Sequence, residues 1–150
     1  MQVIDGRALA REILNDTKHH IAKHGITPGL AILLVGQDPA SHLYVQLKEK
    51  AASKIGVRFE KHLFPAATTQ ATIIQTIKTL NQRTDVHGIV VQLPLPKPLD
   101  ENAVVEAIAP AKDVDGFHPE NIRRLIEGKV VLVPALAQSI VALVRQPGIV

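Results

Sequence analysis

Two side chains that can serve as general acids or bases, Tyr44 and Lys48, lie four residues apart after a continuous apolar run. On a helix this spacing places both on one face, with roughly 5–6 Å between their Cβ atoms. The pair can therefore act on one ligand. The alternative interpretation is that Tyr44 fills the edge of the core while Lys48 is solvated.

A polar amide, Gln92, stands where another apolar run ends, and Leu93-Pro94-Leu95-Pro96 follows it. The prolines fix an extended exit from the strand, so the Gln92 amide is expected at the edge where ligands bind. The alternative is that Gln92 caps free backbone groups at the strand end.

Two carboxylates, Asp113 and Asp115, occupy alternate positions in the turn-forming stretch 112–119. Alternate positions favour opposite directions, so one is expected to cap or bridge while the other faces a cleft. A carboxylate facing a cleft can accept two parallel hydrogen bonds from one ligand edge. The alternative is a turn with two helix-capping acids.

The elements that must position these groups are predicted from apolar spacing, glycines and prolines. The second helix is expected to turn an apolar stripe inward, formed by Leu43, Leu47, Ala51 and Ile55. Helices are predicted over 6–24, 39–55, 70–82, 102–109 and 121–127, and strands over 29–36, 57–64 and 88–93.

This alternation predicts an α/β fold, a three-layer sandwich of a mostly parallel sheet with helices on both faces. In open sheets of this kind, ligands bind outside the carboxyl ends of the strands. The segments after Val35 and Val91 are therefore the expected site.

Composition excludes several classes of function. The 150 residues suit one domain, and 17 Lys and Arg against 14 Asp and Glu, with only four aromatic residues, argue against nucleic-acid binding. No cysteine is present, which fits a reducing cytoplasm, and no apolar run has the length of a membrane span. No metal site is expected, since His20 and His24 lack a third ligand, and neither G-x-G-x-x-G nor a P-loop motif occurs.

Three long segments together resemble the bifunctional methylenetetrahydrofolate dehydrogenase/methenyltetrahydrofolate cyclohydrolases of one-carbon metabolism. They occur in the family's order and the resemblance runs from about Val3 to Pro134. The segments are 29–41 with Tyr44-x3-Lys48-x-Lys50, then 88–96, then 112–119.

The resemblance implies that the region to residue 139 is the folate-binding catalytic domain. It implies catalytic roles for Lys48, for Gln92, which would orient it, and for Tyr44, which would pack on the folate. Asp115 would hold the pterin ring, and substrate contacts would extend to Pro94 and Leu95.

The chemistry of these residues agrees with the implied roles. A pterin edge offers an N–H and an amino group side by side, which one carboxylate can accept. Methenyltetrahydrofolate is a cation, so it disfavours the charged form of a nearby lysine. A neutral Lys48 could then transfer a proton as water attacks.

The chain departs from the family where Pro-Cys-Thr-Pro-x-Gly would stand, since it reads Pro134-Ala135-Leu136-Ala137-Gln138-Ser139. Residues 140–150 are expected to begin the linker helix to an absent dinucleotide-binding domain. No cofactor is therefore expected on this chain alone, and NADP or NAD is implied for the full enzyme. Hydrolysis is favoured over hydride transfer.

Tetrahydrofolate derivatives are the implied substrates, and a homodimer or a separate dinucleotide-binding chain is a possible partner. The exposed apolar tail formed by Ile140, Val141, Leu143 and Val144 favours such a partner. Two other functions stay open: a non-catalytic folate-binding or interaction module, and half of a split enzyme.

Overall fold

The computed structural model describes residues 4–129 and 132–146, in which helices and strands alternate as predicted. The strand that begins at Gly88 ends at Val91, two residues earlier than expected, and the backbone bends at Leu93 and Pro94. The elements are α1 (Gly6–His24), β1 (Gly29–Val35), α2 (Pro39–Ile55), β2 (Arg58–Phe64), α3 (Gln70–Gln82), β3 (Gly88–Val91), α4 (Glu101–Glu106), a short 3-10 turn (Pro110–Lys112), α5 (Pro119–Ile126) and α6 (Ala135–Val144).

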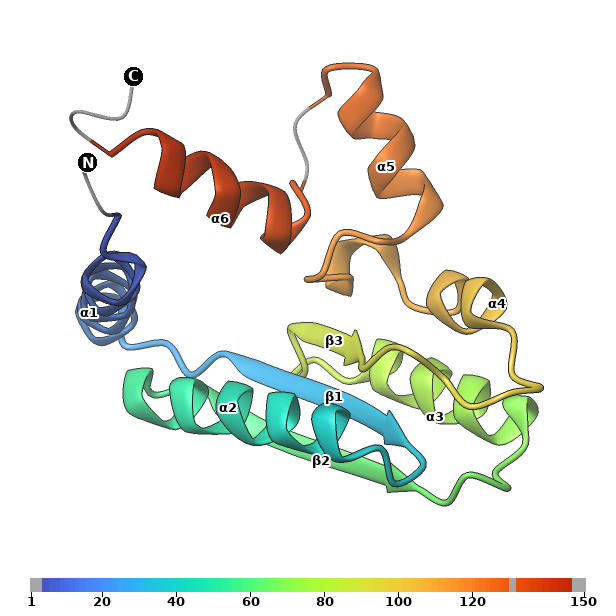
Figure 1. The fold of residues 1–150 in the computed structure, drawn as a ribbon. Helices are drawn as coiled ribbons and strands as arrows, with labels where there is room; N and C mark the ends of the chain where they lie inside the picture. The colour runs from blue at the N-terminus through green and yellow to red at the C-terminus, as the bar shows by residue number, and fades with distance from the viewer. Residues whose placement is uncertain (1–3, 130–131, 147–150) are drawn as a thin grey trace.

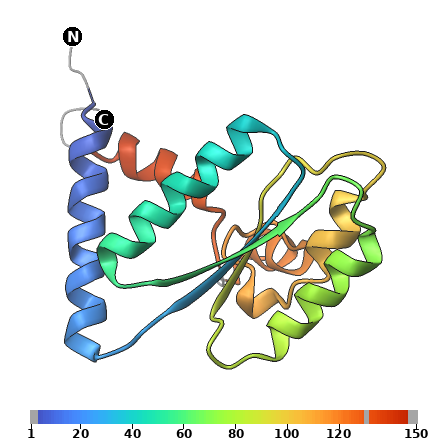
Figure 2. The ribbon, with the colours of Figure 1, turned by 90° about the horizontal axis from the view of Figure 1, so that it is seen from below.

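The three strands form one parallel sheet in the order β2-β1-β3. From β1 the chain moves to one side and from β2 it crosses to the other, so right-handed connections place α2 and α3 on opposite faces. Figures 1 and 2 show the two helices on either side of the sheet. The predicted three-layer α/β sandwich is confirmed.

The core consists of two apolar layers that share β1. Alternate β1 side chains point to opposite faces, which is why this strand reads as a continuous apolar run. One layer joins Ala31, Leu33 and Val35 to Ile73, Ile77 and Leu80 of α3. The other joins Ile32 and Leu34 to Val45 of α2 and Val90 of β3.

The expectation that Leu43 and Leu47 face the core was wrong, because these side chains are 54% and 51% exposed. The buried face of α2 is formed by Ser41, Val45 and Ala52. The helix turns these smaller residues toward the sheet, which lets it lie close to the sheet. Lys48 lies on this inner side, three residues after Val45, and is half-buried.

Local caps fix where α2 begins. The Asp38 carboxylate accepts a hydrogen bond from the Ser41 N–H at 2.7 Å, and Pro39 occupies the first turn. This hydrogen bond holds the pKa of Asp38 below its usual value.

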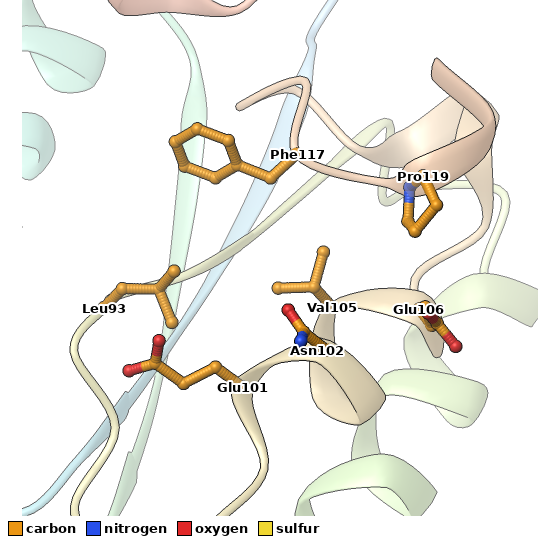
Figure 3. A pocket seen from close by; sticks show the side chains of 7 residues that line it. All are labelled: Leu93, Glu101, Asn102, Val105, Glu106, Phe117 and Pro119. Carbon is orange, nitrogen blue, oxygen red and sulfur yellow. The ribbon is translucent and has the colours of Figure 1, made fainter. Parts of the chain in front are cut away.

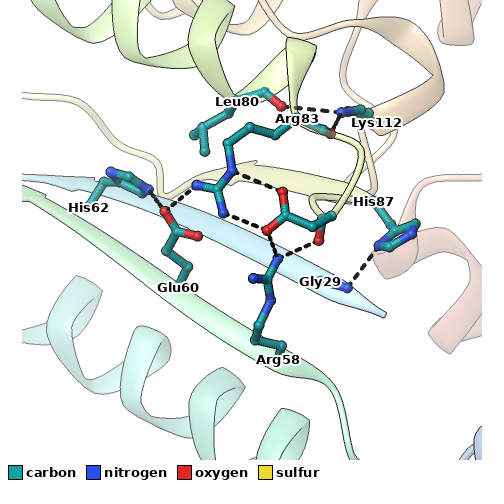
Figure 4. Close-up of polar contacts among 9 residues, drawn as sticks. Gly29, Arg58, Glu60, His62, Leu80, Arg83, His87 and Lys112 are labelled. Atoms are coloured by element: carbon teal, nitrogen blue, oxygen red, sulfur yellow. Dashed lines mark hydrogen bonds and ion pairs between the residues drawn. The ribbon is translucent and has the colours of Figure 1, made fainter. Parts of the chain in front are cut away.

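A polar network ties the outer strand β2 to the end of α3 (Figure 4). Arg83 pairs with Glu60 at 2.8 Å and with Asp85 at 2.9 Å, and Asp85 also pairs with Arg58 at 2.6 Å. The Arg83 guanidinium is the main cause that lowers the pKa of Glu60. Lys112 donates to three backbone carbonyls at the end of α3, those of Leu80, Asn81 and Arg83.

The last helix of the chain, α6, lies near the start of α1 (Figure 2). A Cβ at Gly6 would lie 3.4 Å from Leu143 Cδ2. The expected boundary between residues 139 and 140 falls inside α6, and residues 147–150 of the expected linker lie outside the described residues. Within the described ranges, no helix combines the length and the apolarity that crossing a membrane requires.

Candidate active site

Lys48 of α2 and Gln92, which directly follows β3, contact each other. The Lys48 Nζ donates to the Gln92 Oε1 at 3.1 Å. The Gln92 Nε2 donates to the Leu93 carbonyl at 2.8 Å, which fixes the orientation of the amide. Gln92 is therefore placed to hold the lysine ammonium in one position.

Asp115 reaches the same place on a loop that is anchored on both sides. Val114 packs on the sheet, where a Cβ at Gly88 would lie only 2.7 Å from its Cγ1. Gly116 has φ +76° and a Cβ there would lie 2.9 Å from the Cα of Pro134. The loop can pack this tightly only because residues 88 and 116 are glycines.

Lys48, Gln92 and Asp115 line one open cavity of about 350 Å³. They come from α2, from the end of β3 and from the 113–118 loop, so three separate segments converge there. The remaining lining residues are apolar or small: Val91, Leu93, Phe117, Ala135 and Leu136.

Burial raises the pKa of Asp115 above its usual value. The positive charge of Lys48 opposes this rise, and the negative charge of Asp113 adds to it. A carboxylate in this position is poorly solvated, so donors on a bound ligand would be strongly favoured.

The other three predicted site residues lie outside this lining. Tyr44, one turn before Lys48, is 57% exposed, and Pro94 is also exposed. The Leu95 side chain is 7% exposed and packs in the core, while its N–H donates to Glu101 Oε1 at 2.7 Å. Of the three, Leu95 can therefore present only its backbone to a ligand.

Two apolar lining residues, Leu93 and Phe117, received no role from the sequence. Phe117 follows Asp115 by two residues in the same turn-forming stretch, and this closeness in the sequence was the available signal. The same two residues also line a second hollow of about 460 Å³, with Val105, Pro119 and the polar side chains of α4 (Figure 3).

Part of residues 134–139, the segment expected to depart from the resembled family's pattern, lies in the cavity wall. Ala135 and Leu136 line the cavity directly, and the preceding Pro134 packs on Gly116. The wall at this point is therefore apolar. No group of three or more His, Cys, Asp or Glu side chains that could hold a metal occurs among residues 4–129 and 132–146.

Comparisons with known proteins match this fold and its site segments. Residues 4–115 match the family model described as "Tetrahydrofolate dehydrogenase/cyclohydrolase, catalytic domain". The bifunctional protein FolD of Geotalea daltonii is 44% identical over 151 residues, covering 99% of this chain and 54% of the relative.

Solved structures agree with these matches. The bifunctional FolD enzyme of Campylobacter jejuni superposes with a TM-score of 0.93 at 36% identity, covering 99% of this chain and 54% of that one. The Trypanosoma brucei enzyme, solved with NADP and an inhibitor, gives 0.91 at 36% identity, covering 96% and 51%. The chain thus spans about half the length of the relatives it matches.

Proposed function

Because the chain belongs to the tetrahydrofolate dehydrogenase/cyclohydrolase family, we propose that its cavity binds a reduced folate and hydrolyses the 5,10-methenyl form. One observation carries the proposal: Lys48, Gln92 and Asp115 converge from three segments on a single cavity. These are the residues that can hold a pterin edge and move a proton.

Asp115 would bind the pterin. The ring edge carries an N–H beside an amino group, and the half-buried carboxylate can accept both hydrogen bonds. The exposed ring of Tyr44 is free to pack on the flat part of the substrate, and the backbone of Pro94 and Leu95 would complete the contact.

Lys48 would manage the proton during hydrolysis. Water adds to the carbon between the two nitrogens, one carbon–nitrogen bond breaks, a formyl group stays on the other nitrogen, and a proton is released. The Lys48 amine would take the proton from the attacking water. Gln92 keeps the amine at a fixed place throughout.

Hydride transfer is not assigned to this chain alone. The sequence carries no glycine-rich dinucleotide motif, and Lys48 is the only cation among the described residues that line the cavity. These residues do not fit the pyrophosphate of NADP or NAD. Dehydrogenase activity would require a dinucleotide-binding partner or domain.

The test is the absorbance decay of 5,10-methenyltetrahydrofolate with the protein present, compared with the spontaneous rate. We expect acceleration that Lys48→Met abolishes, because the proton acceptor is lost. Lys50→Met, an exposed lysine on the same helix, is the matched control and should keep the activity. Equal rates for wild type and Lys48→Met would refute the catalytic role.

The apolar wall at Ala135 and Leu136 favours a second candidate, a folate-binding module without turnover. Calorimetry that detects binding of a reduced folate, together with no acceleration of hydrolysis, would select it. A split enzyme is the third candidate, supported by the exposed apolar residues Ile140, Val141 and Val144 of α6. The split enzyme predicts dehydrogenase activity only after a dinucleotide-binding chain is added.

We also propose that the chain forms a homodimer through α6. A cytoplasmic location is part of the same proposal.

A further inference from the structure

The two most buried polar side chains near the site, Asp113 and Asn121, contact each other and do not line the 350 Å³ cavity. Each is 1% exposed. The Asn121 Nδ2 donates to the Asp113 Oδ2 at 2.9 Å and to the Pro110 carbonyl at 2.9 Å. Both partners are acceptors, so the orientation of the amide is fixed.

Asp113 also holds the loop that carries two cavity residues. Its Oδ1 accepts from the Gly116 N–H at 3.0 Å and its Oδ2 from the His118 N–H at 2.8 Å. These two amides flank Phe117, and the first of them directly follows Asp115. One carboxylate therefore fixes the backbone on which both cavity side chains stand.

Asn121 links this loop to α5 at a cost in stability. Its Oδ1 is buried and has no hydrogen-bond partner among the described residues. A buried acceptor without a donor is unfavourable, and an apolar residue of similar size would avoid that penalty. Packing alone does not account for an asparagine here, whereas a need to hold Asp113 does.

We infer that Asp113 and Asn121 are a positioning pair that sets where Asp115 and Phe117 lie in the cavity. Asp113 touches no substrate in this assignment and acts through the loop. The identity of the ligand rests on the proposed function, but the control of loop geometry does not.

The first test measures amide exchange of residues 114–118 in the free protein. We expect Asn121→Ala to speed exchange in this segment by roughly tenfold or more. The loss of one hydrogen bond lowers the free energy of local opening, and the exchange rate rises by about that factor. The matched control is Asn81→Ala, since Asn81 also ties two elements together through the Ala107 carbonyl and the Ala109 N–H. It should leave the segment unchanged.

The second test measures binding of 5-formyltetrahydrofolate, a stable reduced folate, by calorimetry. We expect Asn121→Ala to weaken binding roughly tenfold or more, as a misplaced binding group does, and Asn81→Ala to leave it unchanged. In a background that carries both Asp115→Asn and Phe117→Ala, Asn121→Ala should have little further effect on binding, because the pair acts through these two side chains. A further loss of binding as large as in the wild-type background would contradict the inference.

The two tests separate this inference from the proposed function. If the wild-type protein binds no reduced folate, the proposed function fails, and the exchange measurement still decides the inference. Unchanged exchange at 114–118 in both Asn121→Ala and the milder Asn121→Ser would overturn it.

Discussion

Asp115 carries a negative charge in a half-buried position. This charge lowers the stability of the free protein but favours binding of a ligand that donates hydrogen bonds to it. Its pKa is raised because burial penalises the charged form. In the folded protein the carboxyl binds its proton more tightly than in the unfolded chain. Stability therefore falls as the pH rises through the folded-state pKa.

We predict that Asp115→Asn stabilises the free protein near pH 7 and weakens folate binding. The variant removes the buried charge, so its thermal midpoint should exceed that of wild type at neutral pH. The difference should vanish below the ordinary Asp value of 3.8, where the wild-type carboxyl is also neutral. Binding should weaken about ten- to a hundredfold, since hydrogen bonds to a charged group contribute about 1.5–3 kcal/mol.

Thermal unfolding across pH and calorimetry with a reduced folate provide the two measurements. A variant that is less stable than wild type at pH 7 would contradict the argument from burial. Asp85→Asn is a useful contrast, because paired arginines lower the pKa of Asp85, and its loss should reduce stability at pH 7.

At this scale the sequence predicted that the segments after β1 and β3 lie at one edge of the sheet, and the structure joins Lys48 and Gln92 of these segments at 3.1 Å. The side chains whose placement the sequence did not predict have a physical reason in common. The placement of Leu95 in the core could not be predicted, because its side chain packs in an apolar layer formed by several elements while its N–H donates to Glu101 of α4. Packing between different elements leaves no periodic signal in the sequence.

Helix α2 shows how an element can be predicted with the right ends and the wrong face. Asp38, Pro39 and Gly56 marked its limits, because caps depend on local residue types. Which face of the helix is buried depends on how the helix packs on the sheet. The positions of the large apolar residues Leu43 and Leu47 did not predict that face. Smaller residues face inward, and this places Lys48 toward β3 and Gln92.

We predict that Val45→Ala destabilises the protein by roughly 2 kcal/mol, from about 0.8 kcal/mol per lost methylene and the cavity left behind. Leu47→Ala, two residues later on the same helix, should change stability by about 0.5 kcal/mol or less because the side chain is exposed. Urea unfolding with an unchanged slope would measure both values. A larger loss of stability for Leu47→Ala than for Val45→Ala would mean that Leu47 faces the core, contrary to the structure.

At the scale of the whole molecule, β1 is the element that its neighbours hold most firmly. This strand pairs on both edges and is covered on both faces, whereas no residue of α6 is buried. Local opening is easiest where few apolar contacts hold a segment. The arrangement predicts that the free energy of local opening decreases from β1 to α6, and that β1 opens only on global unfolding.

Native-state hydrogen exchange would measure this gradient. The amides of Ala31 to Leu34 should exchange with the free energy of global unfolding, and those of α6 with a clearly lower value. Equal protection of β1 and α6 would mean that the helix is held by contacts that its exposed surface does not show.

The outer position of β2 also bears on how the protein behaves at high concentration. An uncovered strand edge is a template on which further chains can add, and amyloid fibrils grow in this way. Of the seven residues of β2, Arg58, Glu60 and Lys61 are charged, and Phe59, Leu63 and Phe64 are apolar. Stacking identical copies in register would bring like charges within one ladder spacing, so the charged side chains of β2 that form ion pairs within the fold also oppose fibril growth.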